Sequence, residues 1–267
     1  MKLGISSYTY GWAVGVKGSK PPHPLDEHGL IDKALECGLS LLQIGDNLPL
    51  HTFDSSRLNR LADRAAAEGV DLEVGARGLT SDRLREYAAI ARRVKAGLIR
   101  FVIDDSDYHP KPDAVSAILR SAGPELDNLT IGIENHDRFS AKTLRALIEH
   151  SESSSIGVCL DTANSLGAGE GIDVVAETLG PLTVNLHIKD FQIERLPHMM
   201  GFMVTGRPAG SGFLNVPELL NRLATFGRCK SAVLELWPPP EARIEDTLIR
   251  EENWAVQSLA YLKPFFT

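Results

Sequence analysis

The sequence predicts an α/β fold, a single closed (β/α)8 barrel, on the basis of three observations. Short runs of β-branched and aliphatic residues recur eight times, and segments of helical periodicity lie between them. Neither a linker nor a low-complexity tract divides the 267 residues. Strand and helix units in series are typical of a closed parallel barrel, for which about 250 residues is a usual length. We therefore expect one domain over residues 1–267.

The predicted strands are short and rich in residues that suit a packed, pleated surface. In chain order they are KLGIS (2–6), LSLLQIG (39–45), VDLEVGA (70–76), LIRFVID (98–104), LTIGIE (129–134), SIGVCLD (155–161), TVNLHIK (183–189) and SAVLELW (231–237). Because the strands of such a barrel are parallel, we expect their carboxyl ends to meet at one face.

The predicted helices carry apolar residues at spacings of three and four. Between residues 55 and 69, Leu58, Leu61 and Ala65 recur in this way, and Gly69 can serve as the C-terminal cap. Segments of the same character are 82–97, 141–153, 216–227 and the closing helix 244–262. The stretch 191–213, rich in Gly and Pro, is long for a connection, and we expect an extended loop over the C-terminal face that closes as a lid.

The composition is typical of a soluble globular protein. Hydrophobic residues make up 43% and charged residues 24%, which is ordinary for a soluble protein. The net charge of −7 argues against a broad surface for nucleic acid. Three widely spaced cysteines offer no disulfide framework, and no window reaches the roughly 18 apolar residues of a membrane span. We expect a cytoplasmic protein without a nucleic-acid or membrane partner.

Acidic and histidine side chains stand at the ends of four successive predicted strands. These are Glu134, Asp161, His187 and Glu235. Active sites of (β/α)8 barrels lie at the carboxyl ends of the strands, so we expect these side chains to converge. Carboxylate oxygens with one imidazole suit a hard or borderline divalent ion: Mn²⁺ is the metal we expect first, with Mg²⁺, Co²⁺ or Zn²⁺ as alternatives. Cys159 is expected to be core packing.

Five motifs resemble the xylose-isomerase-like TIM barrel family, which includes sugar phosphate isomerases and epimerases and an AP endonuclease branch. The motifs are IGIENH (131–136), GVCLDTAN (157–164), LHIKDF (186–191), GRPAGSG (206–212) and VLELW (233–237). The resemblance implies that the four residues at the strand ends bind one divalent metal ion. It also implies that Glu134 and Glu235 act as acid and base on opposite faces of a ketose.

The chain departs from the pattern of many relatives at Asn164. Many of them carry Asp-x-x-His where this chain has Asp161-Thr-Ala-Asn164. Asn can donate a hydrogen bond to a substrate, but it cannot transfer a proton near neutral pH as His can. The departure weakens the epimerase reading. It weakens the abasic-site endonuclease reading more, because that branch needs several histidines and the ends of the third and fourth predicted strands carry none.

Cationic and aromatic residues around the expected mouth are candidates for substrate binding. Lys189 lies two residues beyond His187, Arg207 lies in the glycine-rich motif, and His136 follows Glu134 closely. Cations near a metal suit a carboxylate or phosphate group on the substrate. Aromatic rings can pack on the apolar face of a sugar. The full set of predicted substrate residues is His136, Asn164, Lys189, Arg207, Tyr8, Trp12 and Trp237.

The first functional hypothesis is a metal-dependent isomerase or epimerase that acts on a keto-sugar or sugar acid through an enediolate. The alternative is a lyase, a decarboxylase or dehydratase of a 3-oxo sugar acid or inosose, which would use the same metal and acids. Two readings from other classes are a non-catalytic carbohydrate-binding barrel and the endonuclease. The expected partner is a small carbohydrate or sugar acid, and a homo-oligomer is compatible with the sequence.

Overall fold

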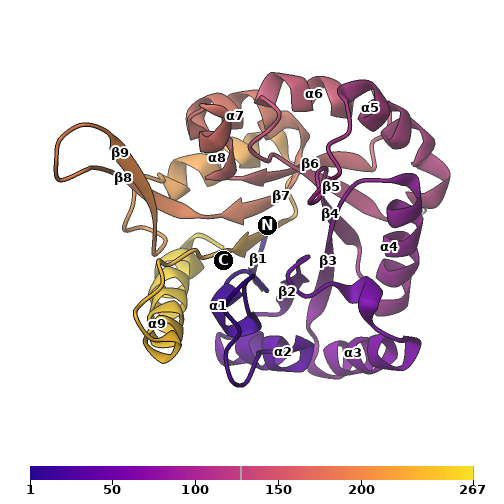
Figure 1. Cartoon of the computed structure of the whole chain (residues 1–267). Coiled ribbons are helices and arrows are strands. Elements are labelled where there is room, and N and C mark those ends of the chain that lie inside the picture. Colours follow the sequence, from indigo (N-terminus) through magenta and orange to yellow (C-terminus); the bar gives the residue numbers. More distant parts are fainter. Residues whose placement is uncertain (127, 267) are drawn as a thin grey trace.

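The computed structural model describes residues 1–126 and 128–266, and it confirms the predicted barrel (Figure 1). Within that part of the chain, eight strands close in the order β1-β10-β7-β6-β5-β4-β3-β2, and every neighbouring pair is parallel. Their bounds are β1 (Lys2–Ser6), β2 (Leu41–Ile44), β3 (Asp71–Arg77), β4 (Leu98–Val102), β5 (Thr130–Glu134), β6 (Ile156–Asp161), β7 (Thr183–Ile188) and β10 (Ser231–Leu234). Every predicted strand is therefore present.

Helices form the outer layer around these strands (Figure 1). They are α1 (Gly11–Val14), α2 (Glu27–Glu36), α3 (Ser55–Glu68), α4 (Ser81–Val94), α5 (Pro112–Ser121), α6 (Ala141–Glu149), α7 (Ile172–Leu179), α8 (Val216–Phe226) and α9 (Ile244–Leu262). Short 3₁₀ turns lie at Leu50–Thr52, Gly123–Leu126, Asn164–Ala168, Gly180–Leu182 and Lys263–Phe265.

Local chemistry explains where the helices begin and end. Side chains at N-cap positions accept hydrogen bonds from backbone N–H groups three residues on, as Asp54 does for α3 and Thr80 for α4. Gly69 ends α3 with φ at 69°, which confirms the predicted cap, since glycine adopts this left-handed conformation without steric cost.

Alternation along each strand divides the core into two parts. On β7, Val184, Leu186 and Ile188 are buried, while Asn185 and His187 bond across the barrel interior to Gln43 of β2. Successive side chains of a strand point to opposite faces, so the aliphatic set faces the helices. The polar set therefore lines the interior and leads toward the carboxyl ends of the strands.

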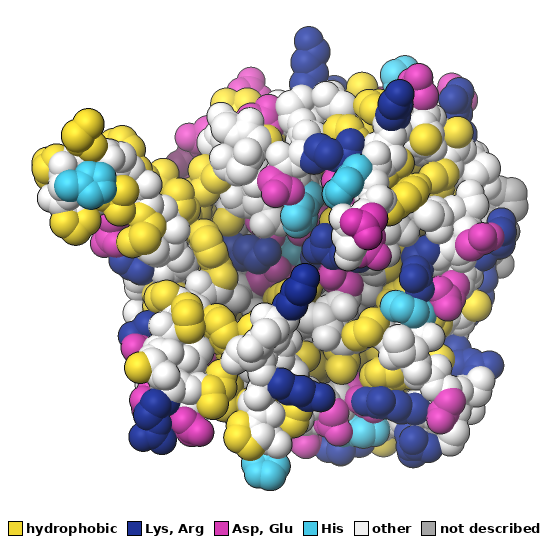
Figure 2. Space-filling model, in the orientation of Figure 1, with side chains coloured by type: hydrophobic (Ala, Val, Ile, Leu, Met, Phe, Trp, Pro, Cys, Tyr) yellow, Lys and Arg dark blue, Asp and Glu magenta, His cyan; other side chains and the backbone are white. Residues whose placement is uncertain are grey.

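The stretch 191–213 differs from the expected loop. Most of it forms an antiparallel hairpin of β8 (Asp190–Arg195) and β9 (Phe202–Arg207), which projects from the barrel (Figure 1). Apolar side chains gather on this hairpin (Figure 2). Ile193 pairs with Val204, so both lie on one face, and the backbone hydrogen bonds of the ladder satisfy groups that an irregular loop would leave to water.

Asp190 ties the base of the hairpin to the glycine-rich segment that follows it. Its buried carboxylate accepts hydrogen bonds from the backbone N–H groups of Gly210, Gly212 and Leu214, at 2.9, 2.9 and 3.0 Å. A Cβ at Gly212 would clash with the Asp190 carboxylate. Gly212 thus permits a close approach of backbone to Asp190.

Replacing Asp190 by alanine is expected to destabilise the protein by about 2 kcal/mol, because the buried N–H group of Leu214 and the partly buried N–H groups of Gly210 and Gly212 would lose their acceptor. Urea unfolding measures this loss, and hydrogen exchange at residues 210–214 should accelerate. Glu194→Ala, on the exposed part of the same hairpin, should stay within about 0.5 kcal/mol of wild type. Equal stability of the two variants would contradict this role of Asp190.

Candidate active site

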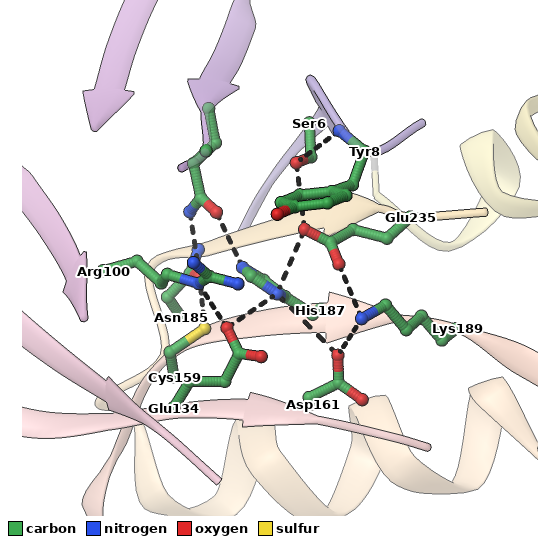
Figure 3. Close-up of polar contacts among 12 residues, drawn as sticks. Ser6, Tyr8, Arg100, Glu134, Cys159, Asp161, Asn185, His187, Lys189 and Glu235 are labelled. Carbon is green, nitrogen blue, oxygen red and sulfur yellow. Dashed lines mark hydrogen bonds and ion pairs between the residues drawn. The ribbon is translucent and has the colours of Figure 1, made fainter. Parts of the chain in front are cut away.

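The four predicted metal ligands lie together at the carboxyl ends of the barrel strands (Figure 3). Glu134 and Asp161 are the last residues of β5 and β6, His187 is the penultimate residue of β7, and Glu235 follows β10 directly. His187 Nδ1 lies 3.2 Å from Glu235 Oε1, 3.6 Å from Glu134 Oε2 and 3.9 Å from Asp161 Oδ2. All four side chains are buried.

His187 presents its Nδ1 atom to these carboxylates. Its other nitrogen, Nε2, lies 2.7 Å from the amide oxygen of Gln43, which can only accept, so Nε2 carries the proton. Among the described residues, His187 Nδ1 has no hydrogen-bond partner, and Asp161 Oδ2 and Glu235 Oε2 are approached only by the ammonium group of Lys189, as an ion pair. Buried acceptors that face one another are costly unless a cation neutralises them, so the donor set fits a divalent metal ion.

Two overlapping groups could hold the ion, and both include His187. One consists of Asp161, His187 and Glu235, the other of Glu134, Cys159 and His187; within each group the ligand atoms lie within 4.8 Å of one another. Burial raises the pKa of the Cys159 thiol well above its ordinary range, and the thiol donates to Asn185 Oδ1 at 3.1 Å. A thiol is a poorer ligand than a thiolate, which favours the first group.

Glu134 is held by groups other than the remaining predicted ligands. Arg100 of β4 donates to one of its oxygens through Nε, and Asn164 Nδ2 donates to the other at 2.7 Å. Arg100 also pairs with Asp46, which in turn pairs with Arg77 at 2.8 Å. The carboxylates outweigh the burial that would disfavour the guanidinium, so the pKa of Arg100 is raised well above its ordinary value.

Lys189 lies between two of the predicted ligands. Its ammonium nitrogen is 2.8 Å from Asp161 Oδ2 and 2.9 Å from Glu235 Oε2 (Figure 3). Burial disfavours the charged form, but the carboxylates of Asp161 and Glu235 outweigh it and raise the pKa of Lys189 well above its usual range. Lys189 therefore stays an ammonium group and is not available as a nucleophilic amine.

The pKa values of Glu235 and His187 are shifted in opposite directions. Burial alone would raise the pKa of Glu235, yet His187 and Lys189 outweigh burial and lower it well below its ordinary value. Burial alone would lower the pKa of His187, yet the Glu235 carboxylate outweighs it and raises the value. Glu235 is consequently ionised over the physiological pH range.

A cavity of about 430 Å³ opens beside these groups, and it is lined partly by predicted substrate residues: Tyr8, Asn164, Lys189 and Trp237. Val204 of the hairpin also lines it. Trp12 lines an adjoining cavity of about 400 Å³ that shares Tyr8 and Trp237. Tyr8 and Trp237 thus line both cavities, and the 430 Å³ cavity also contains Lys189, which pairs with two of the predicted metal ligands.

Arg207 and His136 are placed differently from the other predicted substrate residues. Arg207 bonds to Gln192 and Glu194, on the hairpin face opposite to Val204. His136 is partly exposed and pairs with its neighbour Asp137. Neither lines the 430 Å³ cavity in the described part of the chain.

Three polar residues near the site were not predicted from the sequence. They occupy interior-facing positions of β2, β3 and β4. They are Gln43, Glu73 and Arg100, all buried. Gln43 and Arg100 are single polar residues within the apolar runs LLQIG and LIRFV, and Glu73 lies between Leu72 and Val74 in DLEVG. An isolated polar residue at an alternating position of a buried strand is a usable signal for a barrel interior.

A family model described as "Xylose isomerase-like TIM barrel" matches residues 76–265. The chain belongs to this family. It is 31% identical to the 3-oxo-isoapionate decarboxylase of Pectobacterium atrosepticum over 264 residues, which cover 98% of this chain and 95% of that protein. The family resemblance predicted from the motifs is therefore confirmed, and the named relative is an enzyme.

Solved structures of similar fold cover nearly the whole chain. D-psicose 3-epimerase of Clostridium cellulolyticum, solved with D-tagatose, has a TM-score of 0.75 at 15% identity, over 100% of this chain and 99% of that one. A xylose isomerase-like barrel protein of Mycobacterium smegmatis, solved with magnesium, has a TM-score of 0.70 at 13% identity and covers 97% of both chains. At such identities the similarity concerns the fold. No helix among the described residues is long and apolar enough to cross a membrane.

Proposed function

We propose that the protein is a divalent-metal-dependent decarboxylase of a 3-oxo sugar acid. The observation that carries the proposal is the ion pairing of both candidate acid and base residues: Arg100 pairs with Glu134, and Lys189 pairs with Glu235 at 2.9 Å. The named activity of the relative that is 31% identical supports the same choice. The proposal ranks the lyase hypothesis above the isomerase or epimerase.

An epimerase needs two groups that alternately take and return a proton at one carbon. A carboxylate paired with a permanent cation resists protonation, so it is a weak base and is seldom available as an acid. Asn164, which binds Glu134 at 2.7 Å, cannot replace a proton-transferring histidine. The site is therefore poor in groups that change their protonation state.

Decarboxylation of a 3-oxo acid makes different demands on the protein. The bond to the carboxylate carbon breaks, CO₂ leaves, and the electron pair passes toward the oxo group; the carbon then takes one proton from solvent. Asp161, His187 and Glu235 would hold a divalent ion, for which Mn²⁺ is the first candidate. When bound, this ion would polarise the oxo group. Lys189, which lines the cavity, would bind and orient the substrate carboxylate.

The remaining residues would select a polyhydroxy substrate. Asn164 Nδ2 and the Tyr8 hydroxyl belong to residues that line the same cavity and can bond to substrate hydroxyls. Trp237 offers a ring for the apolar face of the carbon chain. Together they would keep the leaving carboxylate close to Lys189 while the hairpin residue Val204 limits the access of water.

Proton and ¹³C NMR in D₂O tests the proposal, with the Mn²⁺-reconstituted enzyme removed before the spectra are recorded. The substrates are a panel of 3-oxo sugar acids labelled with ¹³C at the carboxylate, together with ketoses and inososes. We expect ¹³CO₂ from an acid and one deuterium at the carbon that carried it. Deuterium beside the carbonyl of a ketose with every carbon retained would overturn the proposal in favour of an epimerase. Loss of water from an inosose would favour a dehydratase.

A further inference from the structure

We propose that Gln43 and Glu73 are positioning residues that hold His187 in the tautomer whose Nδ1 atom is free for a metal ion. The inference rests on the metal centre of the proposed function and is independent of the reaction. Gln43 comes from β2 and Glu73 from β3, two strands that pair with each other across the interior from β7. Neither side chain is part of the predicted ligand set.

Contacts between buried side chains connect Glu73 to His187 through Gln43. His187 Nε2 lies 2.7 Å from Gln43 Oε1, and Gln43 Nε2 donates to Glu73 Oε2 at 2.9 Å. Gln43 Nε2 also donates to Asn185 Oδ1 at 3.1 Å. Glu73 accepts two further bonds, from Asn185 Nδ2 at 3.2 Å and from the Ser231 hydroxyl at 2.5 Å.

The direction of these hydrogen bonds is set by Glu73. An ionised carboxylate only accepts, so the amide of Gln43 must turn its nitrogen toward Glu73. The amide oxygen of Gln43 then faces His187, and the imidazole must donate from Nε2. Its Nδ1 lone pair is left toward Glu235 and Asp161, at 3.2 and 3.9 Å from their nearest oxygens. A chain of one-way bonds thus determines which nitrogen of His187 can bind a metal.

Replacing Glu73 by a group that both donates and accepts would remove this direction. The amide of Gln43 could then turn its nitrogen to His187, which would move the imidazole proton to Nδ1. A proton there would occupy the position that the metal requires. Burial raises the pKa of Glu73, while the hydrogen bonds from Ser231 and Gln43 oppose that shift. The contacts of Glu73 suit the ionised form, because Gln43 Nε2, Asn185 Nδ2 and the Ser231 hydroxyl all donate to its oxygens. The test is made over a series of alkaline pH values, so that the neutral form of His187 is identified from the spectra themselves.

Three variants separate the direction of the bonds from a general disturbance of the interior. Glu73→Gln keeps the shape but loses the acceptor-only character. Gln43→Met removes the acceptor of His187 at similar volume. Ser231→Ala is the matched control: it removes the hydrogen bond from Ser231 to Glu73 and the one that Ser231 accepts from Asn185, yet it keeps the groups that make the Glu73–Gln43 and Gln43–His187 contacts. Far-UV circular dichroism and thermal unfolding verify that each variant folds.

Two readouts are recorded on the full chain. The first is the ¹⁵N NMR spectrum of histidine-labelled, metal-free protein, assigned for His187 by the His187→Ala spectrum. The second is the Mn²⁺ affinity from calorimetry. We expect wild type and Ser231→Ala to show one tautomer, protonated at Nε2, and Glu73→Gln to show a mixture. Mn²⁺ affinity should fall about 10- to 100-fold in Gln43→Met, the usual cost of losing the partner of a ligand histidine, and should be unchanged in Ser231→Ala.

A single Nε2-protonated tautomer in Glu73→Gln together with wild-type Mn²⁺ affinity in Gln43→Met would overturn the inference. The tautomer is read without metal or substrate, so the result does not depend on the proposed decarboxylation. If wild type binds no Mn²⁺, the metal centre of the proposed function fails, while the ¹⁵N spectra still decide whether Glu73 sets the tautomer of His187.

Discussion

Glu235→Gln is expected to lower kcat at least about 100-fold. Glutamine keeps the size of the side chain but removes a negative charge from the predicted ligand set. It also leaves the Lys189 ammonium with Asp161 as its remaining carboxylate at ion-pair distance. The negative charge that develops on the oxo group would then be stabilised less, because the metal would be held less firmly and Lys189 would be less well oriented. Steady-state kinetics at saturating Mn²⁺, together with metal content, measure the loss.

Glu149→Gln is the control for Glu235→Gln. Glu149 is a half-exposed acid on α6 that pairs with Arg145, away from the predicted ligands. The kcat of the Glu149→Gln enzyme should therefore equal that of wild type. A Glu235→Gln enzyme that binds metal and turns over at a near-normal rate would remove Glu235 from the catalytic machinery. Loss of metal without loss of the fold would instead identify Glu235 mainly as a ligand.

Lys189→Met is expected to reduce kcat/KM for a carboxylate-bearing substrate about 100-fold, since a charge-assisted hydrogen bond contributes about 1.5–3 kcal/mol and each 1.36 kcal/mol is tenfold. Mn²⁺ affinity should be retained or increased, because Lys189 approaches the same oxygens of Asp161 and Glu235 that would bind the metal. Calorimetry with Mn²⁺ and kinetics on the same preparation separate the two effects.

Arg207→Met is the matched comparison, because it removes another cation that the sequence placed at the mouth. Its guanidinium bonds to Gln192 and Glu194 on the far face of the hairpin, so kcat/KM should stay within about threefold of wild type. If Arg207→Met lost as much activity as Lys189→Met, the hairpin would have to bring Arg207 to the substrate. If neither variant lost activity, the proposed carboxylate site at Lys189 would be wrong.

Much of the fold follows from local patterns that tertiary contacts do not override. The eight strands were predictable because each is a short aliphatic run between amphipathic segments, as in LTIGIE before 141–153. Strands β4 and β10 end earlier than the predicted ranges 98–104 and 231–237, because pairing with the neighbouring strand stops at Val102 and Leu234. The hairpin was not predicted, since its alternation of apolar residues is interrupted by the Gly, Pro and Met content of its turn.

The position of the candidate site was predictable for a topological reason. Parallel strands bring their carboxyl ends to one face, so acids and a histidine at four strand ends had to meet there. The partners of those side chains were not predictable in this way. Arg100 reaches Glu134 from the neighbouring strand, whereas Gln43 reaches His187 from across the interior. Such contacts depend on the stagger of strands that are far apart in sequence.

Chain order and residue type alone therefore specified the barrel, the face that carries the site and the four candidate ligands, because strand periodicity and parallel pairing place them without reference to distant contacts. Closure of the barrel decided the charge state and orientation of those ligands. Arg100, Lys189 and the Gln43–Glu73 pair act on them through space, at distances that only the packed interior defines. Electrostatic interactions between buried groups depend steeply on separation and on the exclusion of water, and neither is written in the spacing of residues along a chain.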